Sequence, residues 1–497
     1  MSGPAFSPDL LLRRVRRGLG GPEVDVRVAN GTVIGIEVTG AAPGGAEVID
    51  GHGGTLLPGL RDAHVHLSQW AAALQRVDLA ATGSAVEAAE VMRRKHSESG
   101  LSAGQVFIGF GFRDGLWPDA PHKDLLQRVL PQVPAVLISQ DLHCAWFSPA
   151  ALRLVDVDHP TGLLREADCF EALRRLPEAS ADETDGWAIE AANRAAALGV
   201  TEITDFEFTD STVVWARRAQ RNGRLPIRVR AAIRPGGMAE AIERGQRTGA
   251  PVPGTDALVT VGPCKTLMDG SLNTRTAFCH DPYPGVVDPL EARGLLTQDP
   301  DELVSLMRTA AQHGLSFAVH AIGDLANTLA LDCFQAAGVG GRIEHAQLVS
   351  ERDLPRFAEL GVIAGVQPSH AVEDRDVADL QWNSRTDRAY PYASLLAAGA
   401  TLEFGSDAPV SRLDPWNAIA AAVTRTSGGR PPWHGEQAIG VADAISASTG
   451  GRLTPSVGDR ADLVLLAQDP TEVAAEDLAQ MNVLATIVDG RISHRAE

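Results

Sequence analysis

The feature of this sequence that most constrains its fold is an alternation of strand-like and helix-like segments between residues 186 and 404. Short apolar runs recur at 200–204, 227–233, 258–261, 315–319, 341–344, 361–366 and 400–404. Ala-rich amphipathic segments accompany them, for example at 186–198 and 301–312. This alternation favours a parallel sheet covered by helices, and at this length the sheet is expected to close. We therefore predict an α/β protein with a distorted (β/α)8 TIM barrel over residues 58–454.

Both ends of the chain have a different pattern, typical of short antiparallel strands. Strand-like runs occur at 10–14, 24–28, 32–38 and 47–49, and again at 462–466 and 483–488. Turn signals separate them, such as Asn30-Gly31 and Asp489-Gly490. We predict one small β-sandwich domain made of residues 1–57 and 455–497. Residues from about 68 to 195 hold fewer barrel-like units than their number allows, so we predict an insertion that caps the barrel.

The acidic balance of the chain argues against two classes of partner. Asp and Glu number 63 against 44 Lys and Arg, a formal net charge of −19. Such a surface repels nucleic acid and anionic lipid. No apolar run is long enough to span a bilayer, and the five cysteines form no CxxC pair. We expect a cytoplasmic protein that acts on a small molecule.

The motif PGLRDAHVH at residues 58–66 carries the first chemical signal. On a strand, residues two apart point to the same face, so His64 and His66 would aim both imidazoles at one point. Imidazole nitrogen is a good ligand for zinc and similar divalent ions. Two histidines can also fall on one barrel strand without binding a metal, so the rest of the chain decides.

Four further ionisable residues follow predicted barrel strands. Lys265 follows the run that begins at 258, His320 and His345 end the next two runs, and Asp407 follows the last one. The carboxyl ends of barrel strands carry the active site in this architecture. Any one of them could instead cap a helix or be a hydrogen-bonded structural residue. All four at strand ends by chance is a poorer explanation than one site shared with His64 and His66.

Further blocks occur in a fixed order along nearly the whole chain. They are DLHCAW at 141–146, TGLLRE at 161–166, KTLMDGSLNTRTA at 265–277, HAIGD at 320–324, RIEH at 342–345, QPSH at 367–370, GSDAP at 405–409 and ADLVL at 461–465. Together with PGLRDAHVH, this set resembles the amidohydrolase superfamily of metal-dependent hydrolases. Within it, the set is most similar to the YtcJ-like branch, which includes N-substituted formamide deformylases.

The resemblance implies a binuclear centre whose ligands are, in chain order, His64, His66, Lys265, His320, His345 and Asp407. Lys265 would carry a carbamate formed from CO2 that bridges two divalent ions, for which zinc is expected. Asp407 would bind metal and carry a proton. The alternative is an ordinary Lys265 paired with Asp269 or Asp407, which would leave a site for one metal ion.

A second group of residues is predicted on the substrate side of the site. The group consists of His143, Trp146, Asp269, Arg275 and His370. His143 is also assigned a catalytic hydrogen bond to the substrate or to the oxyanion, with a buried structural role as the alternative. Trp146 could instead belong to the core of the insertion. His370 is expected to face the pocket without binding metal.

The resemblance implies hydrolysis of an amide-type C–N bond other than a peptide bond, through a metal-activated water with Asp407 as general base and acid. One rival is a mononuclear deaminase on the same fold, which typically has a Glu shortly after the strand-five histidine. His320 is followed by Ala-Ile-Gly-Asp-Leu-Ala-Asn, without Glu. The other rival, a barrel that only binds a ligand, would show lost metal ligands, whereas all six positions are filled. The resemblance also suggests a homodimer.

Overall fold

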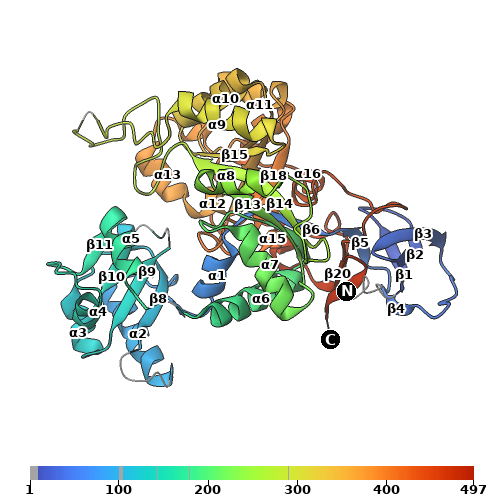
Figure 1. Ribbon diagram of the computed structural model, residues 1–497, viewed down its shortest axis with the longest axis horizontal. Helices are drawn as coiled ribbons and strands as arrows, with labels where there is room; N and C mark the ends of the chain where they lie inside the picture. Colours follow the sequence, from blue (N-terminus) through green and yellow to red (C-terminus); the bar gives the residue numbers. More distant parts are fainter. Residues whose placement is uncertain are drawn as a thin grey trace. The chain divides into compact units, whose positions relative to one another are not determined.

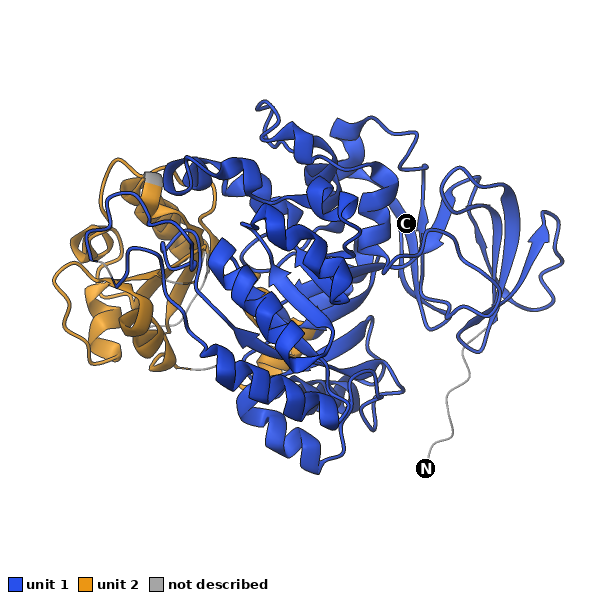
Figure 2. Cartoon of the chain, turned by 90° about the horizontal axis from the view of Figure 1, so that it is seen from above, with its two compact units in different colours: residues 1–67, 189–497 blue, residues 68–188 orange. Residues whose placement is uncertain are grey.

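The computed structural model describes residues 9–99, 105–140, 142, 144–177, 179–288 and 290–496. The chain divides into two compact units, one of residues 1–67 and 189–497 and one of residues 68–188 (Figure 2). Two helices span the boundaries between the units, α1 (Leu67–Ala73) and α6 (Ala181–Ala197). The second unit occupies most of the segment in which the sequence predicts an insertion.

A parallel eight-stranded sheet forms the centre of the first unit (Figure 1). Its strands, in spatial order, are β6 (Leu60–Val65), β12 (Val200–Asp205), β13 (Arg228–Ile233), β14 (Val259–Leu267), β15 (Phe317–Ala321), β16 (Gly341–His345), β17 (Val362–Val366) and β18 (Leu402–Phe404). The first and last strands meet through a parallel bridge between Val65 and Ala408 and a 2.7 Å hydrogen bond from the Asp407 N–H to the His64 carbonyl. The predicted α/β barrel is therefore confirmed.

The barrel strands are almost continuously buried, as expected of parallel strands covered on both faces. Every residue of β12 is buried, and apart from the run at 258–261 the predicted apolar runs begin and end within two residues of the observed strands. Helices of the first unit follow the strands: α7 (Ser211–Asn222), α8 (Met238–Glu243), α9 (Pro300–Gln312), α10 (Asp324–Ala337), α11 (Leu354–Glu359), α12 (Pro368–Glu373), α13 (Arg375–Gln381), α14 (Tyr392–Ala397), α15 (Pro415–Thr424) and α16 (Val441–Ser448).

Strands from both chain ends form a separate mixed sheet, as the sequence predicts. It contains β1 (Leu10–Arg17), β2 (Glu23–Ala29), β3 (Thr32–Val38), β4 (Glu47–Asp50), β5 (Thr55–Pro58), β19 (Leu463–Leu466), β20 (Val483–Val488) and β21 (Arg491–Arg495). The ends are joined where β19 pairs antiparallel with β5. Alternating apolar residues such as Leu10, Leu12, Val26 and Leu465 form its core.

The second unit has its own five-stranded sheet and helices. Its strands are β7 (Val77–Asp78), β8 (Phe107–Phe112), β9 (Ala135–Ser139), β10 (Cys144–Phe147) and β11 (Leu163–Arg165), and its helices are α2 (Ala85–Ser99), α3 (Lys123–Val129), α4 (Pro149–Leu154) and α5 (Glu166–Arg174). Two apolar clusters pack on this sheet, one around Trp146 and one around Phe147. The unit therefore has a hydrophobic core of its own.

No helix in the described part of the chain has the length and apolar character needed to cross a membrane. All five cysteines are buried and free of disulfide bonds.

Candidate metal centre and active site

The carboxyl ends of the barrel strands carry the residues that the sequence singles out. β6 and the residue after it provide His64 and His66, β14 provides Lys265, β15 and β16 provide His320 and His345, and the segment after β18 provides Asp407. His64, Lys265, His345 and Asp407 are buried, whereas His66 and His320 are partly exposed. Strand order thus gathers residues that are up to 343 positions apart, since 407 − 64 = 343.

Asp407 lies at the centre of this group. Its Oδ1 is 3.4 Å from Nε2 of His64 and 3.4 Å from Nε2 of His66, and its Oδ2 is 4.0 Å from Nδ1 of His345. One ligand atom each from His64, His345 and Asp407 fit within 4.8 Å of one another. Nitrogen and carboxylate oxygen at this spacing form a donor set that suits a divalent ion such as zinc.

Two of these residues have an unusual backbone conformation. Asp407 has φ +57° and His345 has φ +79°, in the left-handed region that residues other than glycine rarely adopt. Such strain persists only where the surroundings impose it, and it clusters at functional sites. Here the Asp407 N–H is held by the His64 carbonyl at 2.7 Å, and the N–H that follows His345 is held by the Ala321 carbonyl at 3.0 Å.

Three of the imidazoles have one ring nitrogen next to a fixed acceptor. The pairs are His64 Nδ1 with Glu344 Oε2 at 2.8 Å, His345 Nδ1 with Gln367 Oε1 at 2.8 Å, and His320 Nε2 with the Gly270 carbonyl at 3.1 Å. The Gln367 amide is itself oriented, because its Nε2 donates to the Gly365 carbonyl. An acceptor on one ring nitrogen makes that nitrogen the protonated one and leaves the lone pair on the other.

Burial gives these groups the charge states that a metal requires. It lowers the pKa of His64 to about 4 and that of His320 to about 3, and it lowers the pKa of His345 well below its ordinary value. Burial alone would raise the pKa of Asp407, but the surrounding imidazoles, with His64 foremost, hold it well below its usual range. Neutral imidazoles around an ionised carboxylate are therefore expected at neutral pH.

Lys265 has a buried amine without a hydrogen-bond partner among the described residues. Its Nζ has no hydrogen bond to any residue that the structure describes, Asp269 and Asp407 included. It lies 4.7 Å from the centroid of the Phe206 ring. Burial lowers the pKa of Lys265 to about 7, with Arg234 adding to the shift. A buried amine without a hydrogen bond is costly, and conversion to a carbamate or contact with a metal ion would remove that cost. The residues present therefore fit the metal centre with a carbamate on Lys265 that the family resemblance implies.

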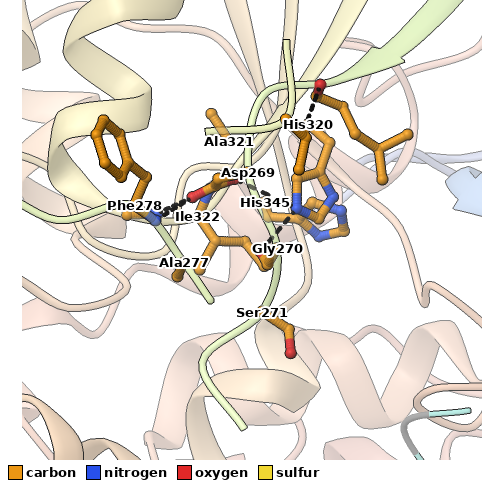
Figure 3. A network of polar contacts seen from close by, with 12 residues as sticks. Asp269, Gly270, Ser271, Ala277, Phe278, His320, Ala321, Ile322 and His345 are labelled. Atoms are coloured by element: carbon orange, nitrogen blue, oxygen red, sulfur yellow. Dashed lines mark hydrogen bonds and ion pairs between the residues drawn. The ribbon is translucent and has the colours of Figure 1, made fainter. Parts of the chain in front are cut away.

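Asp269 has a different environment from the one expected. Its carboxylate is fully buried and accepts the N–H groups of Phe278 at 2.8 Å, Ile322 at 3.0 Å and Gly323 at 2.9 Å, close to the ring of His320 (Figure 3). Burial raises its pKa to about 7. These bonds tie the loop after β14 to the segment that precedes α10. Direct contact between Asp269 and a substrate stays a prediction.

His370 lies beside the metal-site histidines. It is buried in the first turn of α12, and its Nε2 is 4.0 Å from Oδ2 of Asp407. Its ring is parallel to that of His345 at 6.4 Å, and its Nδ1 is 3.2 Å from Nε2 of Gln347. Since an amide nitrogen donates, Nδ1 of His370 accepts and Nε2 carries the proton. That N–H has no partner among the described residues.

The other residues predicted on the substrate side are Arg275, Trp146 and His143. Arg275 has an exposed side chain in a turn after β14, with φ +60°. Trp146 is fully buried in the core of the second unit. His143 lies outside the described residues. Substrate contact by these three residues stays a prediction.

The groups that surround the ligands are not among the residues predicted from the sequence, namely Glu344, Gln367, Phe206 and the Gly270 carbonyl. One signal was available for Glu344. Arg342 and Glu344 stand two apart on a short strand in the middle of the barrel, so they share a face, and a charge buried there needs a partner. For the Gly270 carbonyl the sequence offers no signal, because a loop brings it to His320.

Known proteins resemble the chain over most of its length. N-substituted formamide deformylase of Arthrobacter pascens is 27% identical to this protein in sequence, and the match covers 91% of each chain. The protein YtcJ of Bacillus subtilis strain 168 is 26% identical over 90% of each chain. The crystal structure of a metal-dependent hydrolase from Pyrococcus horikoshii OT3 superposes with a TM-score of 0.79 at 26% identity, over 94% of this chain and 99% of that one.

The predicted resemblance to the YtcJ-like branch is thereby confirmed. The sequence model of the amidohydrolase family matches residues 47–494, which include all the barrel strands and the strands β19 and β20. With a closed barrel and a cluster of histidines and aspartate at the carboxyl ends of its strands, this chain belongs to the amidohydrolase family.

Proposed function

We propose that this protein hydrolyses an amide-type C–N bond, other than a peptide bond, in a small molecule with the help of two divalent metal ions. The observation that carries the proposal is the convergence of buried, neutral imidazoles on the ionised Asp407, beside the orphaned amine of Lys265. A cluster of this kind is costly to bury without a cation to bind.

The ligands divide into two groups in this proposal. His64, His66 and Asp407 would hold one ion, and His320 and His345 would hold the other. Zinc is the expected ion, because nitrogen donors with one carboxylate suit it. When bound, the ions lower the pKa of water towards neutrality and polarise the carbonyl to be attacked.

Lys265 would join the two groups as a carbamate. A neutral amine attacks CO2, a bond forms between Nζ and carbon, and the amine proton leaves to solvent. The carbamate would have a negative charge and two oxygens with which Lys265 could hold both ions. A pKa of about 7 supports this step, because a substantial share of the amine is then neutral at physiological pH.

Asp407 would move the proton. Its depressed pKa keeps it ionised, so it can accept a proton from the attacking water and deliver it to the nitrogen of the leaving amine. His370 would donate its free Nε2–H to the oxygen that develops negative charge. His143 is predicted from the sequence to donate a hydrogen bond to the substrate or to the same oxyanion.

A panel of substrates tests this proposal. The zinc-loaded protein would be offered N-substituted formamides, because one relative is named for them. N-acyl amines, ureas, carbamates, lactams, dipeptides and an amino-heterocycle complete the panel. We expect turnover of at least one non-peptide amide-type bond, its loss after chelation and its return with zinc. Cleavage of dipeptides alone, release of ammonia from the heterocycle alone, or no turnover would contradict the proposal.

A further inference from the structure

A chain of buried charges lies next to His64 inside the barrel. Glu344 on β16 accepts a 2.6 Å hydrogen bond from Nε of Arg342 through its Oε1, and its Oε2 is 2.8 Å from Nδ1 of His64. Arg342 also pairs through Nη1 with Glu403 on β18. The side chain of Glu344 is 0% exposed and that of Arg342 is 5% exposed. The carboxylate thus has one partner that balances its charge and one that belongs to the candidate metal centre.

The space for this carboxylate is provided by a glycine on the neighbouring strand. A Cβ at Gly365 of β17 would lie 2.4 Å from Oε2 of Glu344 and 2.9 Å from Nη2 of Arg342. Contacts this short do not occur, so any other residue at 365 would displace the ion pair. The position of Glu344 is therefore determined by β16, by β17 and by Arg342 together.

The state of Glu344 decides which nitrogen of His64 is free. One oxygen of Glu344, Oε1, forms an ion pair with the Arg342 guanidinium at 2.6 Å, and the other, Oε2, faces Nδ1 of His64 at 2.8 Å. An ionised carboxylate only accepts hydrogen bonds, so Nδ1 of His64 must carry the proton. The lone pair is then on Nε2, the nitrogen that lies 3.4 Å from Oδ1 of Asp407.

We propose that Glu344, held by Arg342, is a positioning residue that fixes the tautomer and ring orientation of His64 and so strengthens His64 as a metal ligand. The inference rests on the proposed metal-dependent function. A carboxylate behind a histidine ligand makes the imidazole more basic and prevents the ring from turning. Glu344 touches neither substrate nor reacting atoms in this role.

The first test compares zinc affinity in two matched variants, measured by competition with a chelator. Glu344→Gln keeps the shape of the side chain but cannot accept from both Arg342 and His64. Glu403→Gln makes the same change on the other carboxylate that pairs with Arg342, which lies among the charges of Arg342, Arg230 and Arg61. We expect zinc affinity to fall about 10- to 100-fold in the first variant and to stay at the wild-type value in the second. Unchanged affinity in Glu344→Gln, or an equal loss in both variants, would overturn the proposal.

The second test needs no substitution of Glu344. It can therefore decide the proposal even when the Glu344→Gln variant does not fold. The metal-free wild-type protein with 15N-labelled histidine would be studied by NMR, and the His64 signals would be identified by their loss in His64→Gln. We expect the proton on Nδ1, and a proton on Nε2 would overturn the proposal.

A wild-type protein that binds no zinc would refute the proposed function, and this role with it. Wild-type binding with unchanged affinity in Glu344→Gln would refute the positioning role alone.

Discussion

Asp407→Asn is expected to lower kcat by about 10²- to 10⁴-fold, the usual contribution of a general acid–base group. The amide has nearly the shape of the carboxylate but cannot accept the proton of the attacking water. Asp407 is also one of the donors that fit within 4.8 Å of one another, so the variant should retain metal less well. The measurement is steady-state turnover of the best substrate in the panel, with metal content determined on the same samples.

The fold should survive the change, which circular dichroism and thermal unfolding would establish. Asp376→Asn is the matched control, because Asp376 is a half-exposed residue that pairs with Arg430 at 2.6 Å on the protein surface. It should leave turnover unchanged. Wild-type turnover in Asp407→Asn would remove Asp407 from the proton-transfer role.

Lys265→Met is expected to abolish turnover and to reduce the metal content from two ions per chain to one or none. Without the amine no bridging carbamate can form. The same change should stabilise the metal-free protein, because Met fills a similar volume and removes a buried polar atom that has no hydrogen bond. The free energy of unfolding should rise by about 1–3 kcal/mol, the typical cost of such an unsatisfied group.

The composition of the chain makes the carbamate easy to detect. Lys95, Lys123 and Lys265 are its three lysines, and Lys95 and Lys123 lie in the second unit. After exchange with 13CO2, the zinc-loaded protein should give one carbamate signal in 13C NMR, which Lys265→Met removes and Lys123→Met retains. A signal that persists in Lys265→Met, or no signal in the zinc-loaded wild type, would contradict the assignment of the carbamate to Lys265.

Most of the barrel could be predicted from the sequence, because its strands are buried on both faces and appear as uninterrupted apolar runs. The exception is β14, predicted to end at 261 but extending to Leu267. Gly262 and Pro263 come directly after the predicted run. In the structure, Gly262 lies against the backbone of Ala231, where a Cβ would come within 2.9 Å of the carbonyl carbon, and the pairing with β13 is irregular there. The two residues mark an irregularity within the strand, not its end.

The start of α6 is marked in the sequence by a capping signal, which the amphipathic pattern does not include. The amphipathic pattern predicted a helix from 186, whereas the helix begins at Ala181. Ser180 and Glu183 form a capping box, in which the Ser180 N–H donates to Glu183 Oε2 at 2.9 Å and the Glu183 N–H donates to Ser180 Oγ at 3.3 Å. Gly186 is therefore tolerated inside an exposed helical turn.

For the site, sequence identified the side chains that converge but not what surrounds them. Ligand candidates could be found because each follows a recognisable strand. The environment of Asp269 could not be predicted from the sequence. Its carboxylate accepts hydrogen bonds from the backbone N–H groups of Phe278, Ile322 and Gly323, which almost any residue would provide. Nor does sequence reveal the left-handed backbone of Asp407, which depends on the closure of the barrel against β6.

The most direct measurement of the central claim is anomalous X-ray scattering at the zinc edge from crystals of the zinc-loaded chain. Two peaks are expected at the carboxyl ends of the barrel strands, one beside His64, His66 and Asp407 and the other beside His320 and His345. Density of a carbamate on Lys265 is expected between them. A single peak would contradict the binuclear centre. The absence of any peak among these residues would contradict metal-dependent hydrolysis at this site.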